Sequence, residues 1–232
     1  MIGLVIATKN RHKVAEIQAI LGTRFHCRTL DDFQTTPEII EDAGTFAGNA
    51  TKKAIAIAKW LSEARASEDE LKDSETFVLA DDSGLEVDAL GGAPGVHSAR
   101  FAAQDTGERG NSSTADNNAK LLRLLKSVPL GKRMARFRCV IALTPVLESR
   151  HQTASPVCSA DEFELQTRIF EGTCEGEIQL LPAGAGGFGY DPLFVPSGYT
   201  QTFGELPEEV KNKLSHRYKA LEKLRSQLGQ MA

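Results

Sequence analysis

The sequence predicts an α/β protein built around a mixed β-sheet. Two observations favour this class. Short apolar runs alternate with segments whose apolar residues recur every three or four positions, which is the pattern of strands interleaved with helices. One run is apolar throughout, typical of a strand buried on both faces, and another alternates apolar and polar residues, typical of a half-exposed strand. A sheet that contains both kinds of strand is expected to be mixed.

The elements follow from local patterns. Residues 4–7 are a buried strand, and apolar positions at helical spacing over 14–21 predict a helix after a polar turn. Thr45 suits the N-cap of a second helix that runs to residue 61, and the acidic residues 62–75 would extend it or form a loop. The remaining expected elements are strand 77–80, loop 90–96, helix 119–125, strand 137–147, irregular segment 148–161, half-exposed strand 163–170, loop 183–192 and amphipathic helix 214–228.

Composition and charge exclude several classes. The chain has 232 residues, 41% of them hydrophobic, and a net charge of −4, so we expect one globular domain over 1–232, of one body or two lobes. This acidic balance argues against nucleic-acid binding. No apolar stretch is long enough to span a membrane and no basic leader precedes the first strand, so the expected compartment is the cytoplasm. The four cysteines form no Cys-x-x-Cys pair, which predicts free thiols and no zinc site.

Three segments carry residues suited to chemistry. The first is the turn at 8–13, which connects an expected strand to an expected helix. Unpaired N–H groups at a helix N-terminus bind phosphate readily, although this could also be a basic surface turn. The residues concerned are Thr8, Lys9, Asn10, Arg11, His12 and Lys13.

The second segment is Asp81-Asp82-Ser83-Gly84 at the end of a buried strand. Adjacent carboxylates of an extended chain point to opposite faces, and two like charges so close need a cation or hydrogen bonds. Mg²⁺ fits, because it takes hard oxygen ligands, and Glu41 could supply a second carboxylate. The alternative is that Asp81 or Asp82 simply caps a turn or helix.

The third group comprises a glycine-rich loop and a basic segment near the C-terminus. The loop contains Phe188, Gly189, Tyr190 and Asp191, and its aromatic rings could stack on a base or plug the core. The basic segment holds donors around the expected N-cap Ser215, namely Lys211, His216 and Arg217, unless it is only a solvated basic face.

Together and in this order, these segments resemble the inosine triphosphate pyrophosphatase family. The matching motifs, which span residues 4 to about 221, are Ala7-Thr8-Lys9-Asn10 with Lys13, Glu41 with Thr45-Phe46 and Asn49-Ala50, Ala80 to Leu85, Val87 to Val96, Ser98-Ala99-Arg100, Gly187 to Pro192, and Ser215-His216-Arg217. The chain departs from the family at His97, where a Tyr is usual, and in longer segments at 62–75 and 148–162.

The resemblance implies an elongated mixed sheet with flanking helices and two lobes around a nucleotide cleft. It also implies a cytoplasmic homodimer that hydrolyses ITP, dITP or XTP between the α and β phosphates, releasing a nucleoside monophosphate and pyrophosphate. Glu41 and Asp82 would hold Mg²⁺, and Asp82 would orient or deprotonate the attacking water, with Asp81 as the fallback.

The same resemblance places the turn at 8–13 on the triphosphate and assigns Lys211, His216 and Arg217 as donors toward the 6-oxo group of the purine, with Ser83 and the loop residues 188–191 also in contact with the substrate. Donors aimed at O6 would reject adenine. Two alternatives remain, a pyrophosphatase of modified pyrimidine triphosphates and a nucleotide-binding module without catalysis. A substrate panel and the effect of Mg²⁺ distinguish them.

Overall fold

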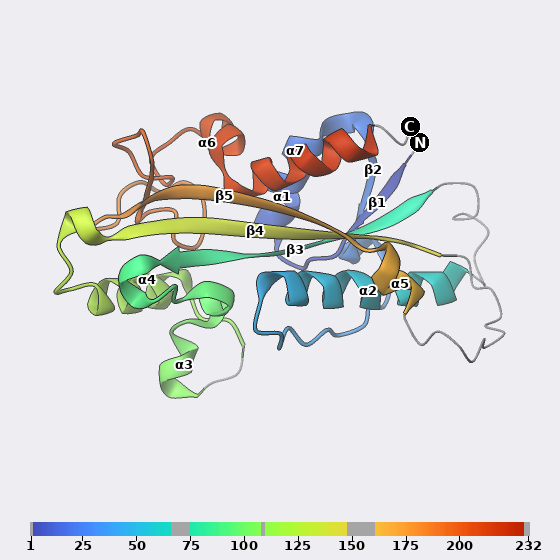
Figure 1. The fold of residues 1–232 in the computed structure, drawn as a ribbon, viewed down its shortest axis with the longest axis horizontal. Helices are drawn as coiled ribbons and strands as arrows, with labels where there is room; N and C mark the ends of the chain where they lie inside the picture. The colour runs from blue at the N-terminus through green and yellow to red at the C-terminus, as the bar shows by residue number, and fades with distance from the viewer. Residues whose placement is uncertain (1, 66–74, 108–109, 148–160, 230–232) are drawn as a thin grey trace. The chain divides into compact units, whose positions relative to one another are not determined.

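A computed structural model describes residues 2–65, 75–107, 110–147 and 161–229, and Figure 1 shows its fold. The chain divides into two compact units. The first comprises Met1–Asp82, Val140–Phe170 and Leu224–Ala232, and the second comprises Ser83–Cys139 and Glu171–Lys223.

A six-stranded sheet has the order β2-β1-β3-β4-β5-β6. Strand β1 pairs in parallel with both β2 and β3, whereas β5 pairs with β6 in antiparallel fashion. The predicted mixed sheet is therefore confirmed. The strands are β1 Gly3–Ile6, β2 His26–Thr29, β3 Thr76–Val87, β4 Met134–Pro145, β5 Arg168–Ile178 and β6 Phe194–Pro196.

In the first unit, helices α1 (Arg11–Leu21) and α2 (Phe46–Arg65) lie on opposite sides of the strands in the view of Figure 1. The predicted N-cap is confirmed, because the Thr45 Oγ1 accepts a hydrogen bond of 3.0 Å from the Gly48 backbone N–H. Strand β3 is longer than residues 77–80, since it continues through the two aspartates to Val87. Most residues of the segment 62–75 lie outside the described part of the chain.

The expected strand at 163–170 is wrong in its first half. Residues Glu162–Gln166 form the short helix α5, and β5 begins only at Arg168. The Asp161 side chain caps this helix by accepting a hydrogen bond of 3.1 Å from the Phe163 N–H, and its carboxylate also pairs with Lys59 of α2. A cap and an ion pair thus outweighed the alternating pattern.

The second unit contains α3 (Ala103–Thr106), α4 (Thr114–Leu124), α6 (Glu208–Leu214) and most of α7 (His216–Leu228). Its core joins side chains of β3, β4, β5 and α4 with those of the loops around β6. Strand β5 carries Gly172 where α7 begins. A Cβ at Gly172 would lie 2.0 Å from the His216 carbonyl oxygen, so only glycine allows the strand and the helix to approach this closely.

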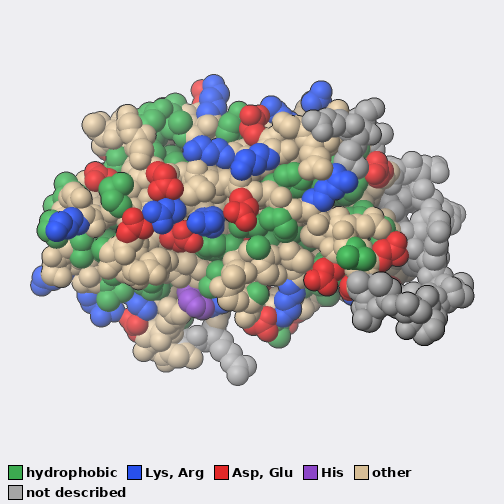
Figure 2. Space-filling model, in the orientation of Figure 1, with side chains coloured by type: hydrophobic (Ala, Val, Ile, Leu, Met, Phe, Trp, Pro, Cys, Tyr) green, Lys and Arg blue, Asp and Glu red, His purple; other side chains and the backbone are tan. Residues whose placement is uncertain are grey.

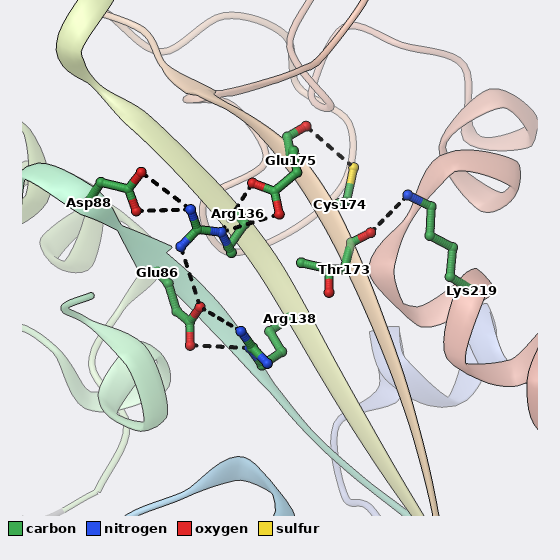
Figure 3. A network of polar contacts seen from close by, with 8 residues as sticks. All are labelled: Glu86, Asp88, Arg136, Arg138, Thr173, Cys174, Glu175 and Lys219. Carbon is green, nitrogen blue, oxygen red and sulfur yellow. Dashed lines mark hydrogen bonds and ion pairs between the residues drawn. The ribbon is translucent and has the colours of Figure 1, made fainter. Parts of the chain in front are cut away.

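One face of β3, β4 and β5 in the second unit carries a ladder of charges (Figure 3). Arg136 lies 3.0 Å from Asp88 and 3.1 Å from Glu175, and Arg138 lies 3.3 Å from Glu86. These side chains are partly exposed, so each pair contributes little to stability. On the face shown in Figure 2, acidic and basic side chains are interspersed.

Two further predictions concern thiols and membranes. Cys27, Cys139 and Cys174 are free, as predicted, whereas Cys158 lies outside the described residues. None of the helices in the described ranges is long and apolar enough to cross a membrane.

Candidate active site

The turn between β1 and α1 is organised by Asn10, the N-cap of α1. Its Oδ1 accepts hydrogen bonds from the backbone N–H groups of His12 (3.0 Å) and Lys13 (3.2 Å). The Asn10 N–H in turn donates to the Thr8 Oγ1 at 3.2 Å. The Asn10 side chain therefore shapes the turn, and Lys9, Arg11 and His12 project from it as exposed residues.

The two aspartates of β3 have different partners. Asp81 is fully buried and forms an ion pair with Lys13 of α1. Asp82 is 7% exposed and accepts a hydrogen bond of 3.0 Å from the Asn49 Nδ2 of α2. Neighbouring side chains of a strand point to opposite faces, as the sequence predicted for this pair. Each carboxylate therefore meets a different helix.

Asp82 is the stronger candidate for a general base. Burial raises its pKa above the ordinary value, although Lys13, Asn49 and Lys53 oppose that shift and Glu41 adds to it. A carboxylate with a raised pKa accepts a proton more readily from water. Asp81 is already neutralised by Lys13, which makes it a poorer base.

The Asn49 side chain also connects Asp82 to the segment that contains Glu41. Its Oδ1 accepts a hydrogen bond of 2.9 Å from the Ala43 backbone N–H, while its Nδ2 binds Asp82. Asn49 is 1% exposed, so this bridge is held rigidly within the core of the first unit. Its amide has both polar ends satisfied.

Lys53 is a candidate functional residue that the sequence analysis missed. Its Nζ lies 2.9 Å from the Glu41 Oε1, and the residue is only 8% exposed. The signal was available, because Lys53 lies four positions after Asn49, on the helix face that also carries the buried Ala50 and Ala54. A lysine on an apolar face is seldom buried without a partner or a function.

Glu41 and Asp82 fit the predicted Mg²⁺ site in their chemistry. The Glu41 carboxylate is 37% exposed and acts electrostatically on Asp82. Mg²⁺ is commonly held by one or two carboxylates together with water and substrate phosphates. Within the described ranges no three His, Cys, Asp or Glu side chains form a group that could hold a metal ion.

The glycine-rich loop of the second unit has a fixed internal geometry. Gly187 has φ +71° and Gly189 has φ +62°, conformations that favour glycine. The Asp191 Oδ2 accepts hydrogen bonds from the Phe188 N–H (2.7 Å) and from the Lys211 Nζ (2.7 Å). A Cβ at Gly187 would lie 2.2 Å from that same oxygen, so the loop closes tightly around the carboxylate.

The two aromatic residues of the loop have different roles in the structure. Tyr190 is 4% exposed, and its hydroxyl donates a hydrogen bond of 2.9 Å to the Ser98 carbonyl oxygen. It therefore anchors the loop in the core, and burial raises its pKa. Phe188 is half-buried, and its ring centroid lies 4.8 Å from the Lys211 Nζ and 5.9 Å from the Arg217 Cζ. Of the two rings considered for stacking, Phe188 is the one that stays partly accessible.

The segment between α6 and α7 brings the remaining candidates together. Ser215 caps α7, as predicted, because its Oγ accepts a hydrogen bond of 3.1 Å from the Tyr218 N–H. The His216 ring stacks on Phe137 with a centroid distance of 4.9 Å, and Arg217, 1% exposed, donates a hydrogen bond of 2.9 Å to the Ser83 Oγ. None of these candidates lies on a solvated basic face.

Lys211, Asp191, His216 and Arg217 are thus all buried, with the first two bound to each other. His97, at the position where a tyrosine was expected, is half-buried, and its Nδ1 has no hydrogen-bond partner in the described ranges. Each unit therefore gathers one part of the predicted set: the residues at 8–13, Glu41, Asp81 and Asp82 in the first, and Ser83 with the residues from 188 to 217 in the second.

The sequence matches one family over residues 4–227. The chain belongs to the Ham1 family. A protein of Halalkalibacterium halodurans named dITP/XTP pyrophosphatase is 43% identical over 221 residues, which cover 95% of each chain. A protein of the same name from Desulforamulus reducens is 46% identical over 221 residues, which cover 95% of this chain and 92% of that protein.

Solved structures of Ham1 proteins share the fold. The structure of a HAM1 protein from Coxiella burnetii superposes with a TM-score of 0.74 at 35% identity and covers 99% of this chain and all of that one. The Staphylococcus aureus Ham1 protein superposes with a TM-score of 0.73 at 32% identity and the same coverage. The resemblance inferred from the motifs is therefore confirmed for the family and the fold.

Proposed function

We infer that this Ham1-family protein hydrolyses non-standard purine nucleoside triphosphates, namely ITP, dITP and XTP, to the nucleoside monophosphate and pyrophosphate. The names of its relatives support a dITP/XTP pyrophosphatase activity. The observation that carries the proposal is the set of groups around Asp82. A buried carboxylate with a raised pKa is surrounded by two lysines, an asparagine and a second carboxylate, which suits water activation beside a polyphosphate.

In this reaction water attacks the α phosphorus and Asp82 accepts a proton from it. The bond between that phosphorus and the oxygen that bridges to the β phosphorus breaks, and pyrophosphate leaves with the bonding electrons. Lys13 and Lys53 lie near enough to influence Asp82 electrostatically, and each ammonium group carries three donors. Each can therefore bind a phosphate oxygen while it keeps its carboxylate partner.

The turn at 8–13 would hold the far end of the triphosphate. The Asn10 Oδ1 is occupied by the helix cap, so its Nδ2, together with the Thr8 hydroxyl and the exposed Lys9, Arg11 and His12, offers donors. Negative charge is favoured at the N-terminus of α1 by the helix dipole.

In the second unit, Phe188 would stack on the purine and Arg217 would donate to its 6-oxo group. The Arg217 guanidinium lies beside the Phe188 ring and is held by Ser83. Tyr190, Asp191, Lys211 and His216 would contribute through the shape of the loop and of the start of α7, since each binds or stacks on another residue of this unit. A buried donor that faces O6 meets the amino group of adenine unfavourably, which supports discrimination against ATP.

Mg²⁺ is the proposed cofactor, held by Glu41 and Asp82. When bound, it supplies positive charge that stabilises the departing pyrophosphate. The further expectations of a homodimer in the cytoplasm stay predictions, and size-exclusion chromatography with light scattering tests the first of them.

The decisive experiment measures pyrophosphate release from ITP, dITP, XTP, GTP, ATP and a modified pyrimidine triphosphate, with and without Mg²⁺. The expected result is Mg²⁺-dependent release from the first three, and loss of at least about 10-fold in kcat for Asp82→Asn, or about 1.4 kcal/mol of transition-state stabilisation. A preference for the pyrimidine substrate, or no release from any of them, contradicts the proposal.

A further inference from the structure

Three hydrogen bonds to other parts of the second unit hold the loop over residues 187–191. Lys211 binds Asp191, and the Tyr190 hydroxyl binds the Ser98 carbonyl oxygen. The third contact comes from α4, where the Asn118 Nδ2 donates a hydrogen bond of 3.2 Å to the Gly189 carbonyl oxygen. Asn118 belongs to none of the motifs that pointed to the substrate.

Asn118 and its neighbour Asn117 differ in how well they are satisfied. Asn117 is 6% exposed, its Oδ1 accepts from the Ala102 N–H at 2.8 Å, and its Nδ2 donates to the Ala99 carbonyl at 3.2 Å. The Asn118 Oδ1, in contrast, is buried and accepts no hydrogen bond from any residue in the described ranges. The first amide is fully paired, whereas the second is paired at one end only.

An amide whose oxygen is buried without a hydrogen bond stabilises a fold poorly. The hydrogen bond to Gly189 is offset by the desolvation of an acceptor that finds no partner, and an apolar side chain of similar size would avoid that cost. An asparagine inside a helix is also less favourable than a leucine. The contribution of Asn118 must therefore be sought in the geometry of the group that it binds.

That group is the backbone next to Phe188. The Phe188 residue lies between two glycines with positive φ, and glycine is the residue with the most accessible backbone conformations. The bond from Asn118 removes part of this freedom by fixing the peptide that follows Gly189, while Asp191 fixes the Phe188 N–H on the other side. The ring is thus presented in one orientation beside Lys211 and Arg217.

We propose that Asn118 is a positioning residue that orders the Phe188 loop for the purine base through the Gly189 carbonyl. This rests on the proposed function, since it assigns the loop to the base of the substrate. The base is remote from the phosphorus that reacts, so the ordering contributes equally to substrate and transition state. Its loss therefore raises KM and leaves kcat nearly unchanged.

The test compares Asn118→Leu and Asn118→Asp with Asn117→Leu as the matched control. Steady-state kinetics with ITP, thermal unfolding, and calorimetric binding of IMP and of pyrophosphate are measured for each. Asn118→Leu is expected to keep or raise Tm, to raise KM about three- to tenfold and to weaken IMP binding by a similar factor. Pyrophosphate binding stays unchanged, because it involves no base. Asn118→Asp raises KM at least as much, since a carboxylate would face the Gly189 carbonyl.

The control separates positioning from stability. Asn117→Leu removes a side-chain amide that is paired at both ends and takes away the acceptor of the Ala102 N–H, so it is expected to lower Tm by about 5 °C or more, whether or not kinetics can be measured on it. If Asn118→Leu lowers Tm as Asn117→Leu does while KM and IMP binding stay as in the wild type, Asn118 is a structural residue and the inference is overturned. Equal weakening of IMP and pyrophosphate also overturns it. An inactive wild-type protein on ITP instead overturns the proposed function, and this inference with it.

Discussion

The buried ion pair between Lys211 and Asp191 allows a quantitative test of how the base-side loop is held. The two side chains are 5% and 4% exposed, and the Nζ to Oδ2 distance is 2.7 Å. In Lys211→Met the Asp191 carboxylate loses this ion pair and keeps the hydrogen bond from the Phe188 N–H. Removing one partner of a buried ion pair costs about 3–5 kcal/mol, because a charge is left without compensation.

For a chain of this size each 1 kcal/mol lowers Tm by about 2–4 °C, so Lys211→Met should unfold about 6–20 °C below the wild type. The double variant Lys211→Met/Asp191→Asn should recover most of the lost stability, because the neutral amide oxygen still accepts a hydrogen bond from the Phe188 N–H. Lys213→Met, an exposed position on the same helix, is the matched control and should change stability by less than about 0.5 kcal/mol.

Differential scanning calorimetry and urea unfolding measure these differences as a double-mutant cycle. The reasoning is refuted if Lys211→Met is as stable as Lys213→Met, or if the double variant is less stable than Lys211→Met alone.

Three further outcomes are expected. Because burial raises the pKa of Asp82, the wild type loses stability as the pH rises from the ordinary carboxyl pKa through the raised one. Asp82→Asn should therefore have a higher Tm than the wild type at neutral pH but not below about pH 3. A Tm difference between the two proteins that does not change with pH would contradict this. Lys13→Ala should raise KM for ITP about 10-fold and lower Tm, since it removes the ion pair of the buried Asp81, whereas Lys9→Ala should change both little. Equal effects of the two substitutions would indicate an unspecific effect of positive charge. Arg217→Ala should lower the ratio of kcat/KM for ITP over ATP by at least about fivefold, and an unchanged ratio would assign Arg217 to phosphate or structure.

Much of the candidate site could be predicted from the sequence because many of the interactions that shape its segments join residues close together along the chain. The N-cap roles of Thr45 and Ser215 depend on hydrogen bonds to backbone groups three residues away. The opposite orientations of Asp81 and Asp82 follow from the alternation of side chains along a strand. Such local relations require no knowledge of the rest of the fold.

Other features depend on partners that are distant in sequence. Lys53 is a candidate site residue because it forms an ion pair with Glu41. Asn118 is a candidate because it donates a hydrogen bond from α4 to the Gly189 carbonyl oxygen. The anchoring of Tyr190 likewise requires the carbonyl of Ser98, which no spacing in the sequence indicates. Residues 163–166 are helical because Asp161 caps α5 and pairs with Lys59 of α2, although the local pattern of apolar residues favoured a strand.

The sequence by itself therefore determined the α/β class, the buried strands, the helix caps and the identity of most candidate site residues. Only the tertiary structure decided which carboxylate pairs with Lys13 and which has its pKa raised by burial, which aromatic ring stays accessible, and which residues bind the loop. The physical reason is that burial and pairing of charged groups depend on contacts between residues far apart in the sequence, such as Lys211 with Asp191, 20 positions apart, and Arg217 with Ser83, 134 positions apart. Local patterns set what each segment can form, and desolvation in the folded chain sets what each polar group can do.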